Sequence, residues 1–231
     1  MFFIRHIPNF LTCCNIVCGL LGIIQVFNNN LMNAAYFVFA GAFFDFIDGF
    51  AARLLKVQST IGKDLDSLAD MVTFGVLPGF VMYKILGIYA TNPYLPNIAL
   101  LIPVFSALRL AKFNNDPRQS VDFFGLPTPA NAIFFVSFPL ILFNDKSHLL
   151  NFIFTQNTLS AIIIIFCLLL VSDLKLFSLK FKKMNWKDNL FPLLLIIISN
   201  ALFFTLFYTA LPLIIILYIL LSLVKNLMYK S

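Results

Sequence analysis

The sequence contains no glutamate and few charged residues of any kind. Charged residues make up only 11% of its 231 residues, whereas hydrophobic residues make up 61%. A soluble domain of this length must cover itself with polar side chains, and this chain has too few of them. The composition therefore excludes a soluble globular protein and predicts an integral membrane protein.

Cysteine and histidine are also scarce. The four cysteines all fall in apolar stretches, and the two histidines lie far apart in the chain. Neither residue shows the spacing of a zinc site or of a disulfide-bonded scaffold. We therefore expect reduced, buried cysteines, and any metal in this protein should have oxygen ligands.

The sequence contains several long runs of apolar residues. A helix that crosses a membrane needs about 20 mostly apolar residues. No small-residue cleavage site follows the first run, so we expect a retained helix and not a signal peptide. The fold class is predicted as an all-α, polytopic transmembrane bundle of about eight helices, at residues 8–27, 31–55, 62–88, 97–113, 129–144, 150–171, 190–207 and 210–227.

The formal net charge of +6 comes from lysines and arginines that gather in alternate loops. This pattern indicates membrane topology and not nucleic-acid binding, because cytoplasmic loops carry an excess of positive charge. With the N-terminus inside, the outer side keeps only Lys146 and, near the end of its helix, Lys84. We predict that both termini face the cytoplasm. The basic segment Lys175–Asp188 is either an interfacial stretch on anionic lipid or a plain charged loop.

Four aspartates between residues 45 and 70 carry the strongest functional signal. A carboxylate costs about 2.5–3.5 kcal/mol at the centre of a membrane helix, so these side chains need cations. Asp45 and Asp48 share one helical face, and Asp66 and Asp70 share a face of the next helix. Two antiparallel helices with a short connection can turn these faces toward each other at the inner membrane boundary.

The residue types around these aspartates favour a particular ligand. Oxygen ligands suit Mg²⁺ or Mn²⁺, and four carboxylates balance two such ions, which can together hold a pyrophosphate. The small residues Gly49, Ala52 and Gly62 leave room for a nucleotide or a partner helix, while Arg53 supplies a planar cation. The alternatives are the ion pathway or proton relay of a transporter, and plain polar packing.

The stretch from Asp45 to Asp70 reads D-x2-D-G-x2-A-R-x8-G-x3-D-x3-D and resembles the signature of the CDP-alcohol phosphotransferase family at every defined position. The resemblance implies transfer of a phosphatidyl or related group from a CDP-activated donor to an alcohol, with release of CMP. It also implies Asp70 as the general base. The implied metal ligands are Asp45, Asp48, Asp66 and Asp70, and the implied contacts of the CDP group are Gly49, Ala52, Arg53, Gly62, Asn9 and Thr12.

Further stretches, at residues 7–19, 109–114 and 125–130 and at Val171-Ser172, resemble one branch of this family, the bacterial membrane-embedded phosphatidylserine synthases. This branch implies CDP-diacylglycerol and L-serine as substrates, surrounding membrane lipid, and a homodimer in the bacterial inner membrane with its site facing the cytoplasm. Glycerol 3-phosphate or inositol is the alternative acceptor. The branch usually carries Arg where Lys112 stands.

Serine has a carboxylate that needs a cation, and Arg109 and Lys112 lie three residues apart at the end of a predicted helix. They either bind this carboxylate or are ordinary positive flanks of a membrane helix. Asn15 either contacts substrate or bridges helices, and Thr128 either lines the site or shapes the entry to its helix. We expect residues 1–175 to form the catalytic unit and 176–231 to add the basic segment and a C-terminal hairpin.

Overall fold

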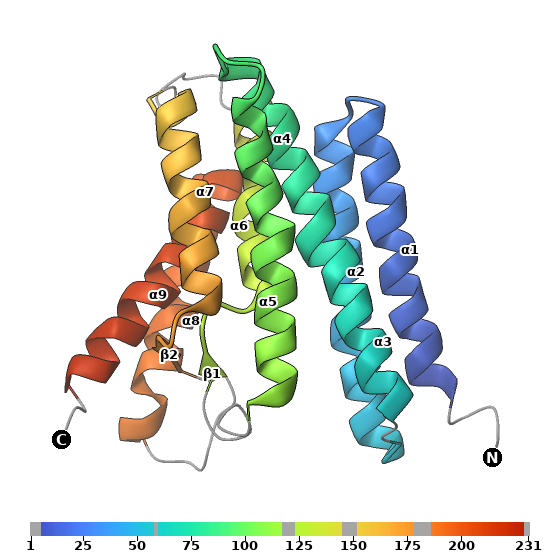
Figure 1. Cartoon of the computed structure of the whole chain (residues 1–231). Helices are drawn as coiled ribbons and strands as arrows, with labels where there is room; N and C mark the ends of the chain where they lie inside the picture. Colours follow the sequence, from blue (N-terminus) through green and yellow to red (C-terminus); the bar gives the residue numbers. More distant parts are fainter. Residues whose placement is uncertain (1–5, 58–59, 117–122, 145–151, 178–185, 229–231) are drawn as a thin grey trace.

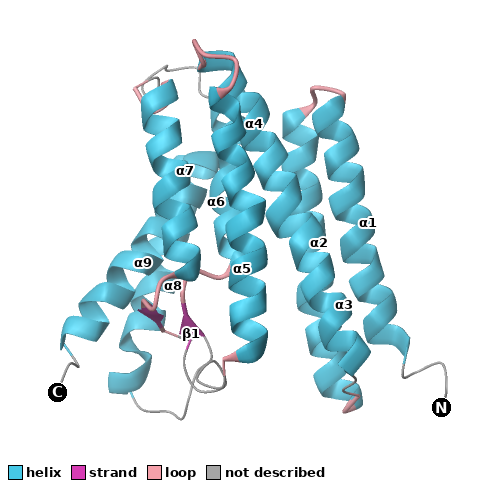
Figure 2. Ribbon diagram, in the orientation of Figure 1, coloured by secondary structure: helices cyan, strands magenta, loops and turns pink. Residues whose placement is uncertain are grey.

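The computed structural model describes residues 6–57, 60–116, 123–144, 152–177 and 186–228, and almost all of them are helical (Figure 2). In chain order the elements are α1 (Ile7–Phe27), α2 (Leu31–Leu55), α3 (Thr60–Asp70), the π-helix η2 (Met71–Val76), α4 (Leu77–Tyr89), the 3₁₀-helix η3 (Leu95–Leu100), α5 (Leu101–Asn115), β1 (Phe123–Phe124), α6 (Thr128–Asn144), α7 (Gln156–Val171), β2 (Lys175–Leu176), α8 (Trp186–Leu206), the 3₁₀-helix η5 (Phe207–Thr209) and α9 (Ala210–Met228). The predicted helical bundle is confirmed.

Within the described residues, five helical stretches are long and apolar enough to cross a membrane: Ile7–Phe27, Leu31–Leu55, Thr60–Tyr89, Leu95–Asn115 and Asn189–Met228. The helices Thr128–Asn144 and Gln156–Val171 are apolar but shorter. The chain is therefore an integral membrane protein, while the count of eight spanning helices remains a prediction. Helix α1 begins and α9 ends at the same end of the bundle, where α2 also ends and α3 begins (Figure 1).

The predicted third span is one continuous rod made of α3, η2 and α4. The preceding helix, α2, ends at Leu55 and is capped by Lys56, whose left-handed backbone (φ 53°) closes the helix. The rod changes from α- to π-helix directly after Asp70. Such π-helical insertions are rare and occur frequently at functional sites.

Helix α6 lies at the centre of the bundle, and most of its residues are buried. A helix that is apolar all round belongs in a core, and its rings pack against α7, where Phe134 stacks on Phe166 with a centroid distance of 3.7 Å. Helix α9 adds Ile215 and Ile219 to the same core. The first residue of this central helix, Thr128, is itself fully buried.

Strands β1 and β2 form an antiparallel pair in which Phe123 lies opposite Leu176 and Phe124 opposite Lys175. The pair joins the connection before α6 to the chain that leaves α7. Most of the predicted interfacial segment, residues 178–185, lies outside the described residues, as do Arg5 and Lys146. The division into residues 1–175 and 176–231 stays a prediction.

Candidate active site

Helices α2 and α3 bring the predicted aspartates together. Asp45, Asp48 and Asp66 each offer a carboxylate oxygen, and these oxygens lie within 4.8 Å of one another. Asp70, one turn beyond Asp66, interacts electrostatically with Asp45 and Asp66. Asp48 is buried, and the other three are partly buried. Hard divalent cations prefer such a set of converging carboxylate oxygens, so the cluster fits a metal ion.

The neighbouring helix α1 contributes a hydroxyl to this cluster. Thr12 Oγ1 donates a hydrogen bond of 2.6 Å to Asp48 Oδ2, and it also lies 3.0 Å from the Pro8 carbonyl one turn earlier. A hydrogen bond of this kind orients a carboxylate for a metal. Thr12 was predicted to contact nucleotide, and the structure places its side chain against a predicted metal ligand.

A cavity of about 610 Å³ opens beside the aspartates. The start of α1, the end of α2 and the start of α3 provide its walls, and its volume lies in the usual range for small-molecule sites. Five of the six predicted CDP contacts line it, and two of the predicted metal ligands do so as well. The lining residues are Pro8, Asn9, Thr12, Asp48, Gly49, Ala52, Val57, Thr60, Gly62, Lys63 and Asp66.

Arg53 is the predicted CDP contact that does not line the cavity. Its side chain is exposed at the end of α2, and Nη1 lies 3.4 Å from the position that a Cβ on Gly49 would take. Lys63 lines the cavity instead, and the motif analysis missed it although it follows Gly62 directly. Its Nζ donates a 3.3 Å hydrogen bond to the Asn114 carbonyl, which ties α3 to the end of α5.

Arg109 lies inside the bundle and faces Asp70. The side chain is buried, Nη1 donates a 3.0 Å hydrogen bond to Thr128 Oγ1, and the guanidinium lies 4.8 Å from the centre of the Phe113 ring. The guanidinium also interacts electrostatically with Asp70. An ordinary positive flank of a membrane helix would turn its charge to water, so this buried arginine is suited to bind an anion.

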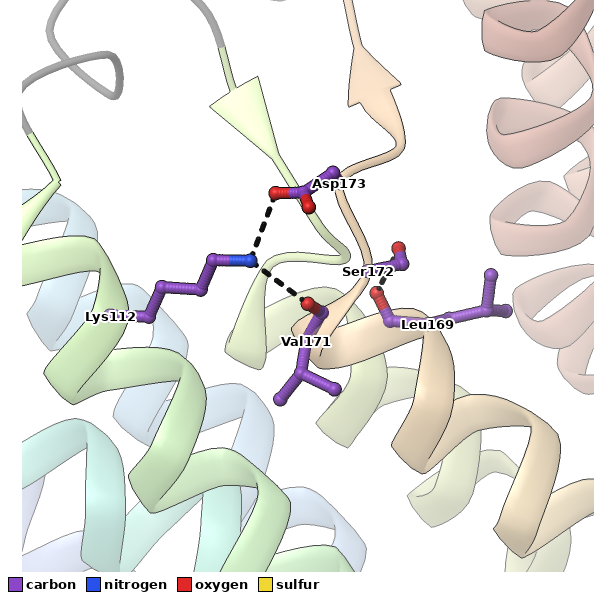
Figure 3. Close-up of polar contacts among 5 residues, drawn as sticks. All are labelled: Lys112, Leu169, Val171, Ser172 and Asp173. Atoms are coloured by element: carbon purple, nitrogen blue, oxygen red, sulfur yellow. Dashed lines mark hydrogen bonds and ion pairs between the residues drawn. The ribbon is translucent and has the colours of Figure 1, made fainter.

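The Lys112 side chain points toward the end of α7, as Figure 3 shows. Its Nζ donates to Asp173 Oδ1 at 2.9 Å and to the Val171 carbonyl at 3.1 Å, at the end of α7. Lysine commonly satisfies the last carbonyls of a helix in this way. Arg109 and Lys112 therefore do not converge on one group, and Lys112 joins α5 to α7.

The turn before α6 completes this junction, which we call the α5–α7 clasp (Lys112, Asp173 and Gly125). Gly125 has φ +76°, and its N–H donates to the Leu174 carbonyl at 3.0 Å. A Cβ at this position would lie 2.4 Å from the Leu170 carbonyl oxygen, so no other residue fits without movement. The clasp thereby sets the start of α6, including Thr128.

Small residues let α1, α2 and the α3–α4 rod approach closely. A Cβ on Gly19 would lie 2.5 Å from Thr73 Oγ1, and one on Gly41 would lie 2.4 Å from Thr73 Cγ2. Membrane helices often use small residues in this way. Thr73 Oγ1 donates a 3.0 Å hydrogen bond to the Asn15 carbonyl, whereas the Asn15 amide is buried without a partner among the described residues. This packing holds the two acidic helix faces together.

The chain is similar to known proteins over most of its length. Residues 5–223 match the CDP-alcohol phosphatidyltransferase family. A protein of Helicobacter pylori (strain 26695) named CDP-diacylglycerol–serine O-phosphatidyltransferase is 33% identical over 194 residues, which cover 83% of this chain and 79% of the relative. Proteins of the same name from Methanocaldococcus jannaschii (34% identical, 76% of this chain and 77% of the relative) and Bacillus subtilis (41% identical, 54% and 70%) are also similar.

Proposed function

Because the chain belongs to the CDP-alcohol phosphatidyltransferase family, we propose that it transfers the phosphatidyl group of CDP-diacylglycerol to the hydroxyl of L-serine. The products are phosphatidylserine and CMP. The observation that carries this proposal is the cavity of about 610 Å³ that shares Asp48 and Asp66 with the carboxylate cluster. The names of three relatives from distant organisms support serine as the acceptor.

The donor fits this end of the bundle for a physical reason. The acyl chains of CDP-diacylglycerol stay in the bilayer, while its cytidine and pyrophosphate need a polar site at the membrane boundary. Gly49, Ala52 and Gly62 line the cavity without bulky side chains, so a nucleotide can approach the backbone closely. Asn9 and Lys63 add polar contacts, and the exposed Arg53 can reach a phosphate from the mouth of the site.

We propose that Asp45, Asp48, Asp66 and Asp70 bind two divalent cations, Mg²⁺ or Mn²⁺. The oxygen-only donor set and the spread of oxygens within 4.8 Å support this assignment. When bound, the cations neutralise the pyrophosphate and the leaving CMP. Thr12 keeps Asp48 oriented through its 2.6 Å hydrogen bond.

The chemical step is a direct displacement. The serine oxygen forms a bond to the β-phosphorus as the bond to the bridging oxygen breaks, and the electron pair leaves with CMP. Asp70 accepts the proton of the serine hydroxyl. Its Oδ1 is buried and has no hydrogen-bond partner in the part of the chain that the structure describes, so it is available for this proton. Arg109, beside Asp70, binds the serine carboxylate.

We assign Lys112 a positioning role in place of the predicted contact with serine, since both of its hydrogen bonds run to the end of α7. The distribution of lysine and arginine supports an N-in, C-in orientation with the site on the cytoplasmic side of the bacterial inner membrane. The family resemblance supports a homodimer. Residues 176–231 would then form an accessory hairpin beside the catalytic unit.

The test is an acceptor comparison with purified protein. CDP-diacylglycerol and Mn²⁺ or Mg²⁺ are incubated with labelled L-serine, glycerol 3-phosphate or inositol in parallel, and lipid products are separated. We expect labelled phosphatidylserine and stoichiometric CMP from serine, and loss of both products after chelation. Labelled lipid from another acceptor alone would refute the proposed acceptor. Turnover that is indifferent to chelation would refute the metal site.

A further inference from the structure

Four buried polar atoms on α5 and α6 lack hydrogen-bond partners among the described residues. They are Ser106 Oγ, Arg109 Nε and both amide atoms of Asn131, and none of them has a partner within the described ranges. Ser106 and Asn131 have no exposed surface at all, and Arg109 is 7% exposed. Buried polar atoms are nearly always paired with protein, water or ligand. Such a group of unpaired atoms therefore indicates a place where a polar molecule binds.

These side chains belong to two antiparallel helices, α5 and α6, which the Arg109–Thr128 hydrogen bond joins. Arg109 of α5 donates a 3.0 Å hydrogen bond to Thr128 of α6, so these two residues lie at the same height along the two helices. Ser106 precedes Arg109 by three residues, and Asn131 follows Thr128 by three. Residues three apart share a helical face, and the helices run in opposite directions (Figure 1). Ser106 and Asn131 are therefore both one turn further into the bundle than the Arg109–Thr128 pair.

The same group of residues borders the predicted general base. Arg109 interacts electrostatically with Asp70, and Ser106 packs on η2, the segment that follows Asp70. A Cβ built on Gly75 of η2 would lie 3.1 Å from the Ser106 Cβ. Asparagine in a membrane helix usually bonds to another helix, but the Asn131 side chain makes no such bond to any described residue.

We propose that Ser106 and Asn131 bind the α-ammonium group of the acceptor serine and so select an amino acid over other alcohols. This inference rests on the proposed function. The ammonium group has three donors, and Asn131 Oδ1 and Ser106 Oγ can accept two of them. Arg109 Nε donates to the serine carboxylate, and Asn131 Nδ2 can donate there as well. In this arrangement each of the four unpaired protein atoms has a hydrogen-bond partner, and the hydroxyl group of the bound serine points toward Asp70.

The first experiment measures the KM for L-serine in Ser106→Ala and Asn131→Ala. Loss of a hydrogen bond to a charged group should raise this KM about tenfold or more, with the KM for CDP-diacylglycerol changed less than about twofold. Ser137→Ala and Asn144→Ala are the matched controls, because both side chains already bond within α6, to the Phe134 and Leu140 carbonyls. The controls should keep the wild-type KM.

A second measurement separates ammonium binding from a general disturbance of the fold. 3-Hydroxypropionate keeps the hydroxyl and carboxylate of serine but has no ammonium group. As a competitor of serine, it should inhibit Ser106→Ala with the wild-type inhibition constant, and Asn131→Ala should weaken its binding less than it weakens the binding of serine. Equal weakening of serine and of 3-hydroxypropionate, or an unchanged KM for serine in both variants, would overturn the proposed ammonium site. Failure of the wild-type protein to make phosphatidylserine would instead refute the proposed function itself.

Discussion

Replacement of Gly125 by alanine should disrupt the junction that places the start of α6. Gly125 has φ +76° and lies against the last turn of α7, where an added Cβ would be 2.4 Å from the Leu170 carbonyl oxygen and 3.1 Å from that of Ser172. Both neighbours are backbone atoms. They cannot move independently of the turn, because the N–H groups of Gly125 and Leu126 are bonded to this same segment at 3.0 Å.

The expected cost has two parts. A left-handed conformation costs a residue with a Cβ about 1–2 kcal/mol, and forcing extra atoms into a packed site costs about 1–3 kcal/mol. Together they should lower the free energy of unfolding by roughly 2–5 kcal/mol. Each kcal/mol corresponds to a fall of roughly 2–4 °C in the midpoint of thermal unfolding for a chain of this size.

The substitution should also affect the reaction. Thr128 lies three residues after Gly125, and its hydroxyl accepts the 3.0 Å hydrogen bond from Arg109. A shift of this turn therefore loosens the arginine beside Asp70. We expect Gly125→Ala to raise the KM for serine several-fold, while the KM for CDP-diacylglycerol stays near its wild-type value because the donor cavity lies on other helices.

The measurements are thermal unfolding in detergent and steady-state kinetics for both substrates. Gly87→Ala is the matched control, because Gly87 is exposed on α4 and a Cβ there would have its nearest neighbour at 3.8 Å. Gly125→Asn tests the cause, since asparagine tolerates positive φ but still carries a Cβ. If Gly125→Ala left both the unfolding midpoint and the serine KM unchanged, the reasoning would be refuted. If Gly125→Asn had the wild-type midpoint and KM, the clash of the added Cβ would be excluded as a cause.

Four other substitutions test the remaining parts of the site. Asp70→Asn should abolish phosphatidylserine formation while CDP-diacylglycerol binding stays measurable, because the proton acceptor is lost and the donor cavity is not. Thr12→Val should raise the metal concentration needed for half-maximal activity about tenfold, since partners that orient metal ligands contribute 10–100-fold to affinity. Lys112→Met and Asp173→Asn should each lower activity, and the double variant should be no worse than the poorer single one, because both remove the same contact.

Each of these tests has its own control. Turnover retained in Asp70→Asn would exclude Asp70 as the general base. Thr12→Ser should keep the wild-type dependence of activity on metal concentration, because the hydroxyl remains. Lys112→Arg should preserve activity, since a guanidinium can donate to both partners of the lysine. If Lys112 contacted serine directly, Lys112→Met alone would raise the serine KM and Asp173→Asn would not. The exposed pair should contribute only about 0–1 kcal/mol to stability.

Much of the fold and half of the site follow from local sequence patterns. Apolar runs long enough to span a bilayer predict the helices, and the structure places α1, α2 and the α3–α4 rod within a few residues of the predicted ranges. The spacing of Asp45, Asp48 and Asp66 predicts their convergence, because residues three and four apart share a helical face and one short loop joins the two helices. These features depend only on neighbours in the chain.

The rest depends on contacts between residues far apart in the chain, which periodicity cannot specify. Arg109 and Lys112 share one predicted helix end, yet the first is buried against Thr128 and the second bonds to Asp173. Asn131 lies within the predicted helix 129–144, and its importance lies in being buried with no hydrogen-bond partner among the described residues. The sequence alone thus determined a helical membrane protein with an acidic site. The packing of distant helices decided which cations and amides surround Asp70, because side-chain direction is set only when the helices meet.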